Sequence, residues 1–198
     1  TDDQARKPVK PQGKITRAEV ATIFFRMLTD ESRNAYWSQS NSFTDVAADA
    51  WYNNAISTMA NAGFLDGYED GSFHPNGYIT RAEFAVIAAR FFDMDYQGED
   101  LFPDIDGHWA QDYINEAANA GIVNGYEDGT FQPQRTANRA EAATIFMRLE
   151  QTVNASPQSP EGAAIEAYET VAAETRQIER KYENTDGVVP REKLEPLL

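Results

Sequence analysis

Residues 61–83 read NAGFLDGYEDGSFHPNGYITRAE, and residues 119–141 read NAGIVNGYEDGTFQPQRTANRAE. The two stretches align without a gap, and three glycines, two aromatic residues and the proline of the first recur at the same spacing in the second: Gly63, Gly67, Gly71, Tyr68, Phe73 and Pro75. A partial third copy, ITRAE at 15–19, is followed by VATIFFRML. Since internal repetition is the sequence signature of an architecture built from similar units, these repeats decide the fold.

Each full repeat has the pattern of a helix, a loop and a second helix. In the first helix, apolar residues recur with the 3.6-residue period at 55–60 and 114–118. Gly63 and Gly121 suit the left-handed residue that follows a helix C-terminus. The glycine-rich GYEDG that comes next is typical of a tight turn. We therefore expect a helix–loop–helix unit.

The second helix of each repeat is predicted to begin with a capping box. The N-cap side chain accepts a hydrogen bond from the amide of the third helical residue, and the Glu at that position bonds back to the N-cap amide. Each such cap contributes about 1 kcal/mol. The residues predicted to cap the three helices are Thr16 with Glu19, Thr80 with Glu83, and Asn138 with Glu141.

The order and spacing of FxDV, Trp, GxxxGYxDGxFxP and ITRAE resemble S-layer homology repeats, over roughly residues 8–150. The resemblance implies an all-α fold, a pseudo-threefold bundle of three central helices behind the TRAE motifs, from which helix–loop–helix prongs radiate. It also implies non-covalent attachment of exported proteins to bacterial cell-wall polymers. Such polymers are typically secondary cell-wall polysaccharides that carry pyruvate ketals, and the family binds them in grooves between adjacent repeats.

The sequence departs from this pattern at its N-terminus, where the partial copy lacks FxDV, the Trp helix and GYxDG. Three central helices are therefore expected but only two full prongs, so a groove that needs the missing prong is incomplete. The predicted organisation is a partial repeat at 1–33, repeats at 42–93 and 101–152, a linker at 153–160, an amphipathic helix at 161–184 and a tail at 185–198. The 161–184 helix has a heptad-like apolar stripe, which would either fill the place of the missing prong or bind a partner.

Arg17, Arg81 and Arg139 each occupy the first position of a predicted central helix. A cation is unfavourable there because the helix N-terminus carries positive partial charge, so helix stability does not explain why the arginine recurs. A guanidinium beside free amides is instead a good site for a carboxylate. Since a pyruvate ketal carries a carboxylate, we expect these arginines to bind the ligand.

Two further groups of residues are candidates for ligand contact. Trp51 and Trp109 either pack against their own helices or present a flat ring to a sugar face. The GYEDG turns are first of all structural, but their glycines allow a ligand or a neighbouring helix to approach the backbone closely. The turn residues retained as candidates are Gly67, Gly125, Asp70 and Asp128.

Composition excludes several other classes of function. The chain has 17 Lys and Arg against 32 Asp and Glu, a net charge of -15, which argues against a nucleic-acid binder and an anionic membrane surface. It has no Cys and only two His, and its acidic turns do not match the EF-hand spacing, so we expect no metal site and no cofactor. Asp45 and Asp104 are interpreted as N-caps of the following turns. We find no paired acid, base and nucleophile, and expect no enzyme.

The leading hypothesis is a cell-wall anchoring module of an exported bacterial surface protein, with the wall polysaccharide or decorated peptidoglycan as partner. The alternatives are an assembly scaffold that recruits a protein through the 161–184 helix, and the anchor of a larger surface enzyme or adhesin. No leader precedes the first repeat and no apolar run is long enough to span a membrane, so we expect a mature or fragment form at the cell surface. Residues 34–154 carry five Lys and Arg against eighteen Asp and Glu. Binding of an anionic polymer must therefore be local to the motif arginines, and a wall with amine decorations remains the other possibility.

Overall fold

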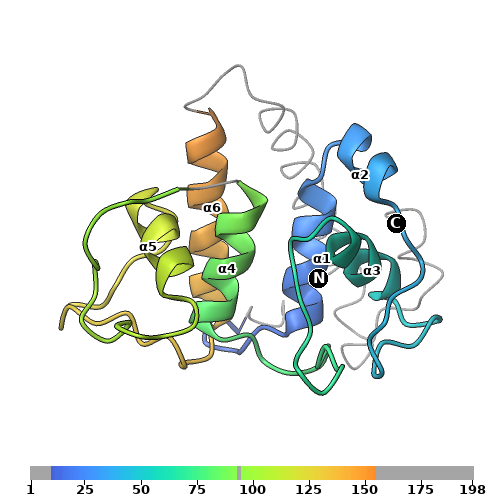
Figure 1. The fold of residues 1–198 in the computed structure, drawn as a ribbon, viewed down its shortest axis with the longest axis horizontal. Helices are drawn as coiled ribbons and strands as arrows, with labels where there is room; N and C mark the ends of the chain where they lie inside the picture. The colour runs from blue at the N-terminus through green and yellow to red at the C-terminus, as the bar shows by residue number, and fades with distance from the viewer. Residues whose placement is uncertain (1–9, 93–94, 155–198) are drawn as a thin grey trace, which may run out of the picture.

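The computed structural model describes residues 10–92 and 95–154. In these ranges the chain forms six α-helices and no β-sheet, which confirms the predicted all-α fold (Figure 1). The helices are α1 (Arg17–Met27), α2 (Asp30–Tyr36), α3 (Asn53–Asn61), α4 (Arg81–Phe91), α5 (Gln111–Asn119) and α6 (Arg139–Asn154). None of the helices in these ranges is both long and apolar enough to cross a membrane.

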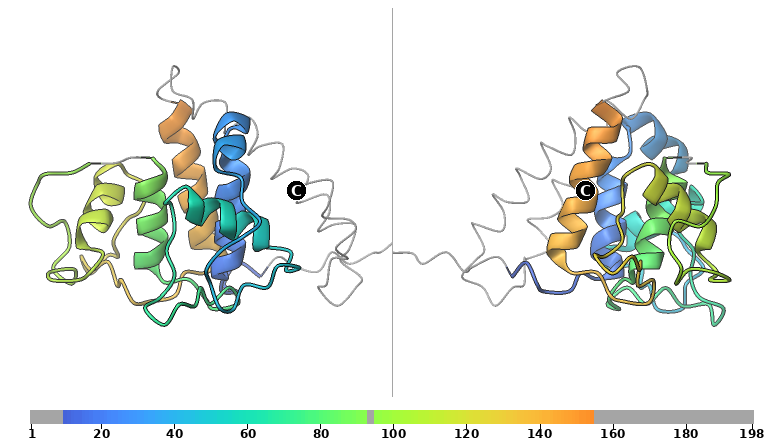
Figure 2. Two further views of the ribbon diagram at one scale, coloured as in Figure 1. Left: turned by 45° about the vertical axis from the view of Figure 1, so that its right-hand side comes forward. Right: turned by 90° about the vertical axis from the view of Figure 1, so that its left-hand side faces the viewer.

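The three helices behind the TRAE motifs, α1, α4 and α6, stand side by side at the centre (Figures 1 and 2). The other helix of each full repeat packs on the outside of this trio, α3 against α1 and α5 against α4. The turn of the 42–93 repeat contacts α1 through Arg17 and α4 through Glu83. The turn of the 101–152 repeat likewise contacts α4 through Arg81 and α6 through Glu141. This alternation fixes where grooves between repeats can form.

Each central helix begins with the hydrogen bonds of a capping box. At α1 the amide of Glu19 donates to Thr16 Oγ1 over 3.2 Å, and the amide of Thr16 donates to Glu19 Oε2 over 2.8 Å. The same pair of bonds joins Thr80 to Glu83 at α4. At α6 the Asn138 side chain accepts from the Glu141 amide over 2.8 Å. The helices consequently start with their amides satisfied although they are packed closely together.

One phenylalanine from each central helix meets the other two in the core. The rings of Phe24, Phe84 and Phe146 lie 5.2–5.9 Å apart, centroid to centroid, in tilted or edge-on pairs. Aromatic pairs of this geometry contribute about 0.5–1.5 kcal/mol each beyond the burial of their surface. All three rings are buried, so they join the three repeats into one hydrophobic core.

The N-termini of the central helices are linked in a ring by their neighbours' loops. The first helical amide of α1 donates to the Gly77 carbonyl, that of α4 to the Arg135 carbonyl, and that of α6 to the Gly13 carbonyl, over 2.8–2.9 Å. Isolated antiparallel bridges run beside these bonds, at Lys14–Asn138, Thr16–Tyr78 and Thr80–Thr136. The partial N-terminal copy therefore closes the pseudo-threefold bundle, because its residues 11–13 cap α6.

Two features of the chain differ from the sequence-based description or lie beyond it. The repeat pattern predicts no helix after α1, yet α2 begins at the N-cap Thr29, whose hydroxyl accepts from the Ser32 amide over 3.1 Å. The predicted linker at 153–160 lies almost entirely outside the described residues, and the 161–184 helix wholly so. The hypothesis that this helix replaces the missing prong is therefore not tested.

Candidate functional site

The arginines at the start of α1 and α4 are buried and hold the turn of the next repeat. Arg17 is 6% exposed; its Nε donates to the Phe73 carbonyl over 2.8 Å and its Nη2 to the Asp66 carbonyl over 3.2 Å. Its Nη1 also pairs with Glu83 Oε1 at 2.8 Å. The guanidinium therefore links a central helix, the turn of the following repeat and that repeat's capping Glu. A bond between residues 17 and 73 has no local signature in the sequence.

Arg81 repeats these contacts one unit further along the chain. It is 7% exposed and donates to the carbonyls of Phe131 and Asn124 over 2.9 and 2.7 Å. Burial lowers the pKa of its guanidinium below the ordinary value, although Tyr126 and Glu141 act in the opposite direction. Arg139 is more exposed, with 38% of its side chain accessible, and its Nη1 pairs with Glu19 Oε1 at 2.9 Å. The turn that would complete its contacts aligns with residues 2–9, outside the described ranges.

The aspartates of the FxDV motifs accept hydrogen bonds from the backbone of the segment that follows each GYEDG turn. Asp45 accepts from the amides of Phe73 and His74 over 2.7 and 2.8 Å. Asp104 makes the matching bonds to residues 131 and 132. The interpretation of both aspartates as N-caps of the next turn is therefore wrong. They bond some 28 positions downstream, and sequence spacing alone gives no signal for that partner.

The phenylalanine of the same motif explains the first glycine of GYEDG. A Cβ placed on Gly67 would lie 2.5 Å from the Phe43 ring and 2.6 Å from the Ser72 carbonyl oxygen, and Gly125 is crowded in the same way by Phe102. Both glycines are therefore required by packing inside their own repeat. Ligand contact by Gly67 and Gly125 stays a prediction.

The aspartates of the turns, Asp70 and Asp128, close small loops of their own. Asp70 accepts from the amide and hydroxyl of Ser72, and these bonds hold the pKa of its carboxyl below the ordinary value. Asp128 does the same with Thr130. Across the described residues, no group of three or more His, Cys, Asp or Glu is placed to hold a metal ion.

A groove of about 770 Å³ lies between the two full repeats. One wall is the turn at 65–70, the floor is the face of α4 that carries Glu83, Ile87 and Arg90, and the far side is formed by Trp109 and Gln134. Its volume falls within the ~300–1,000 Å³ of typical ligand sites. The sequence-predicted candidates that meet here are Arg17, Gly67, Asp70 and Trp109, together with the capping residues Thr80 and Glu83.

The two tryptophans of the repeats have different surroundings. Trp109 borders the groove with 63% of its surface exposed, and the ring of His108 lies 5.5 Å from it, centroid to centroid. Trp51 is 41% exposed, packs edge-on against Tyr52 at 5.2 Å and does not line the groove. Trp109 is therefore the more exposed of the two rings and the one that borders the groove.

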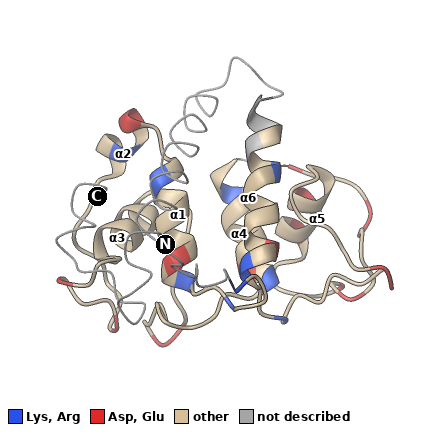
Figure 3. Ribbon diagram, turned by 180° about the vertical axis from the view of Figure 1, so that it is seen from behind, with Lys and Arg blue, Asp and Glu red and all other residues tan. Residues whose placement is uncertain are grey.

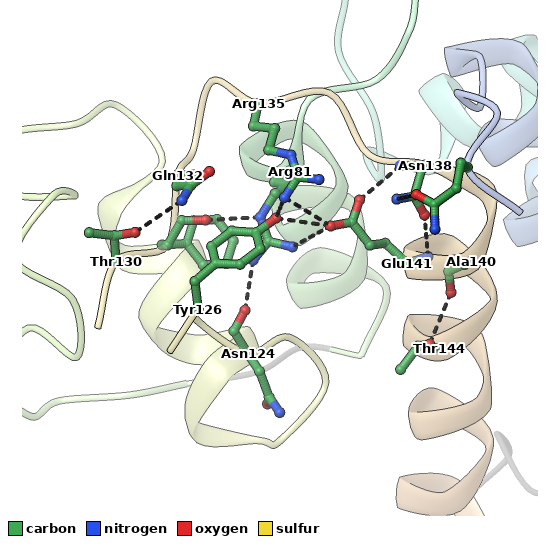
Figure 4. Close-up of polar contacts among 12 residues, drawn as sticks. Arg81, Asn124, Tyr126, Thr130, Gln132, Arg135, Asn138, Ala140, Glu141 and Thr144 are labelled. Atoms are coloured by element: carbon green, nitrogen blue, oxygen red, sulfur yellow. Dashed lines mark hydrogen bonds and ion pairs between the residues drawn. The ribbon is translucent and has the colours of Figure 1, made fainter. Parts of the chain in front are cut away.

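The turn of the second full repeat carries a different set of charges (Figure 4). Arg81 and Arg135 flank the Tyr126 ring at 4.7 and 5.0 Å, and both approach the same carboxylate oxygen of Glu141, at 3.8 and 3.4 Å. Gly77 occupies the aligned position in the first repeat. Among the described residues, Arg17 is the one cation that forms an ion pair with Glu83. The repeated motif does not indicate Arg135, because this residue lies outside the TRAE pattern.

The different charges around the two turns affect the pKa of their tyrosines, Tyr68 and Tyr126. Burial and a hydrogen bond to Glu83 raise the pKa of Tyr68 to about 12, against the opposing charge of Arg17. Burial and the hydrogen bond to Glu141 also raise the pKa of Tyr126, but two arginines oppose the shift there. The second turn is therefore the more electropositive of the two. Figure 3 shows the wider pattern, with Lys and Arg mainly at the central helices and Asp and Glu mainly along the loops.

The architecture and the paired turns define an all-α protein built from similar helix–loop–helix repeats. The S-layer homology domain model matches the chain at residues 42–85 and 101–143. The chain therefore carries two S-layer homology domains, as the motifs predicted. The N-terminal copy, with its capped α1 but without a full prong, falls outside both matches.

Proteins similar to this chain include some that are named for the cell surface or for anchoring, and some enzymes. The chain is 39% identical over 145 residues to a cellulosome-anchoring protein of Acetivibrio thermocellus, an alignment that covers 70% of this chain and 32% of that protein. It is 31% identical over 193 residues to the surface-layer 125 kDa protein of Lysinibacillus sphaericus, covering 94% of this chain and 15% of the relative. A third relative is an amylopullulanase of Thermoanaerobacterium thermosulfurigenes, 36% identical over 149 residues, with 71% of this chain and 8% of the enzyme covered. The chain thus spans about a third or less of the length of these relatives.

Proposed function

We propose that the chain anchors an exported bacterial surface protein by binding a secondary cell-wall polysaccharide, pyruvylated as the family resemblance implies, in the groove between its two full repeats. The observation that carries the proposal is Trp109, which stands 63% exposed at the edge of a 770 Å³ groove. A flat aromatic ring with a polar N–H suits a sugar face. The turn and α4 supply hydroxyl, carboxylate and guanidinium groups for the sugar's hydroxyls.

The proposal assigns one complete groove to the described part of the chain. A complete groove needs a turn, a central helix and the tryptophan of the following repeat, and 65–70, α4 and Trp109 provide all three. The turn at 123–128 faces α6, but the described residues bring no tryptophan to it. Trp51 lies by α1, but the turn that would face it aligns with residues outside the described ranges.

The charged side chains of the groove determine how well it would bind the carboxylate of a pyruvate ketal. Four carboxylates and two guanidiniums line it, and the two guanidiniums already pair with Glu83 and Asp66. A ligand carboxylate that reaches Arg17 would share it with Glu83, so a sugar without charge or with an amine is accommodated more easily here. The predicted ligand role of Arg81 and Arg139 fits a carboxylate better, because Arg135 adds a half-exposed guanidinium next to Arg81. We propose that the pyruvate, where present, is bound at this second turn.

A sedimentation assay with isolated wall sacculi tests the proposal. Trp109→Ala is expected to reduce binding about tenfold or more, as loss of a buried aromatic contact does at other interfaces. Trp51→Ala is the matched control, because it removes the same residue from the same motif outside the groove, and it is expected to retain binding. Equal retention by both variants, at unchanged thermal unfolding, would contradict the assigned groove.

The same assay with purified polysaccharide, before and after chemical removal of its pyruvate, separates the two parts of the proposal. Loss of binding on depyruvylation, with a matching loss for Arg135→Gly, would support recognition of the carboxylate. Unchanged binding by the depyruvylated polymer would remove the pyruvate from the proposal and leave the groove in place. Because the relatives are much longer than this chain, we further propose that the module anchors a larger surface enzyme or adhesin.

A further inference from the structure

A second cavity of about 580 Å³ lies beside the groove, at the other end of α4. It is bordered by the loop that ends α3, by the last turn of α4, and by α5, from which Tyr113 and Glu116 project into its lining. Asp66 and Arg90 line both this cavity and the groove. The two cavities are therefore neighbours with a shared boundary.

The boundary is an ion pair between the turn of the first full repeat and the central helix α4. Arg90 Nη1 lies 2.6 Å from Asp66 Oδ2, and the Arg90 guanidinium lies 5.1 Å from the centre of the Tyr113 ring. Asp66 belongs to the turn of the first full repeat, Arg90 to α4, and Tyr113 to the second repeat. The pair is partly open to solvent, with 71% of the Asp66 side chain and 26% of the Arg90 side chain exposed. A ligand that passes from the groove into the second cavity would lie across these side chains.

We infer that the second cavity is a subsite for the next sugar of the same polymer, so that the chain binds at least two consecutive units, one on each side of the Arg90–Asp66 pair. This inference rests on the proposed function. A polysaccharide is a linear ligand, and two adjoining cavities on one helix face fit a linear ligand better than they fit a single small molecule. The boundary residues hold their positions through each other and need no ligand to order them.

The lining of the second cavity indicates which kind of sugar it takes. Tyr113 offers a ring for the face of a pyranose, and the carboxylates of Asp66 and Glu116 accept hydrogen bonds from hydroxyl or amino groups. Two carboxylates stand against one guanidinium, so an acidic sugar would be repelled. Gly63, with φ of +77°, has no heavy atom within 4 Å of where a Cβ would be, so the backbone there is open to a ligand. The subsite therefore fits an uncharged or amine-bearing sugar.

The second full repeat has an uncharged counterpart of this boundary, in which the amide oxygen of Asn124, oriented to satisfy both amide atoms, accepts from Arg148 Nη2 over 3.0 Å. The position of Asp66 is taken by Asn124, and within the described residues no prong helix packs on the outside of α6 as α5 packs on α4. The subsite is therefore a property of the complete groove. With this subsite the chain would recognise two consecutive sugars of a polymer, whereas without it the chain would recognise a single decorated sugar.

Calorimetric titration with fragments of the purified wall polysaccharide tests this inference. Fragments of one sugar and of four or more sugars are prepared by partial hydrolysis and titrated into the wild-type chain. Longer fragments are expected to bind at least about tenfold tighter than the single sugar, as one further set of contacts would give. Tyr113→Ala is expected to abolish this gain and to leave the affinity for the single sugar unchanged.

A second variant and a control keep the outcomes distinct. Ala62→Trp fills the second cavity from the loop after α3 and should have the same selective effect, with circular dichroism verifying the fold of each variant. Trp109→Ala should weaken fragments of every length. Equal affinity for short and long fragments in the wild type, or an unchanged gain in both Tyr113→Ala and Ala62→Trp, would overturn the second subsite while the groove stands. Failure of every fragment to bind the wild type would overturn the proposed function with it.

Discussion

The two GYEDG turns are built alike but differ in what they present to a ligand. Each is held by a buried arginine from the preceding central helix, an aspartate from its own FxDV motif and a tyrosine bonded to a capping Glu. Among the aligned positions at which they differ, two change the formal charge: Asp66 and Gly77 of the first repeat become Asn124 and Arg135 of the second. Both changes make the second turn more positive. The two repeats therefore share the hydrogen bonds that hold their turns, while two substitutions make the charge of the turns different.

The comparison also shows how one framework tolerates different ion pairs. Glu83 has Arg17 at 2.8 Å, a short and nearly buried pair, with side-chain exposures of 12% and 7%. Glu141 has two arginines at longer range, 3.8 and 3.4 Å. The first pair is therefore the more dependent on a single partner, and the predictions below test this asymmetry.

Removing the central arginine should cost more stability at the first turn than at the second. Arg17→Ala leaves Glu83 nearly buried without its cation and two backbone carbonyls without their donor, which costs about 3–5 kcal/mol. Arg81→Ala frees the same number of carbonyls, but Glu141 keeps Arg135, so the expected cost is about 2–3 kcal/mol. Urea unfolding of both variants measures the difference in the free energy of unfolding.

Adding Arg135→Gly to Arg81→Ala provides the control for this comparison. The double variant should lose about as much stability as Arg17→Ala, because Glu141 then has neither of its two arginines. A loss for Arg81→Ala alone that equals or exceeds that for Arg17→Ala would break the proposed asymmetry.

The tyrosines predict a difference at alkaline pH. The pKa of Tyr68 is about 12 in the folded chain, against about 10 for an unperturbed tyrosine. The unfolded chain therefore loses this proton first, so the contribution to the free energy of unfolding is full below pH 10 and falls as the pH rises toward 12. Tyr68→Phe should flatten this fall more than Tyr126→Phe, because two arginines oppose the rise in the pKa of Tyr126 and one opposes it at Tyr68.

Urea midpoints at two pH values, one below 10 and one between 10 and 12, make the measurement. Tyr78→Phe, in which an exposed phenol is removed, serves as the control for the general titration of the chain. Identical pH profiles for the Tyr68 and Tyr126 variants would show that the second arginine has no influence on its turn.

The smallest expected effect concerns the residue after the anchoring phenylalanine of each turn. His74 and Gln132 have φ of +53° and +56°, in the left-handed region that glycine adopts without strain. Gln132→Gly should stabilise the chain by about 0.5–1 kcal/mol. His74→Gly should gain less, because His74 also lies 2.9 Å from the Ser72 hydroxyl and packs on Tyr68 at 4.8 Å. Thermal unfolding of the two variants measures the difference, and a larger gain at His74 would contradict the role given to its ring.

The features of the fold that depend on local spacing could be predicted from the sequence. The helices of each repeat and the Thr16–Glu19 type of cap are local patterns, in which partners stand three or four residues apart. The contacts that hold the repeats together are not local. Arg17 bonds to the carbonyl of Phe73, and Asp45 to its amide, across spacings that a periodic pattern does not encode. For this reason the sequence suggests the following turn as the partner of Asp45, whereas the structure shows the Phe73 amide.

The candidate site was predicted in part for the same reason. The motif led to Trp109 and the turn at 65–70, which do line one groove, but it treated Trp51 as its equal. The two tryptophans differ in the turn that faces them: residues 65–70 face Trp109 across the groove, whereas the turn that would face Trp51 aligns with residues outside the described ranges. Arg135 and the Arg90–Asp66 pair were missed because they lie outside the repeated letters. A position-by-position comparison of the two repeats, with attention to where charge changes, is the signal that could have found Arg135.

The central proposal is that the described part of the chain holds one complete glycan-binding groove. Calorimetric titration of the chain with single-site fragments of the wall polysaccharide tests this claim most directly through the number of sites per chain. The account predicts one site, lost in Trp109→Ala and retained in Trp51→Ala. Two sites of comparable affinity, one removed by each tryptophan substitution, would contradict it.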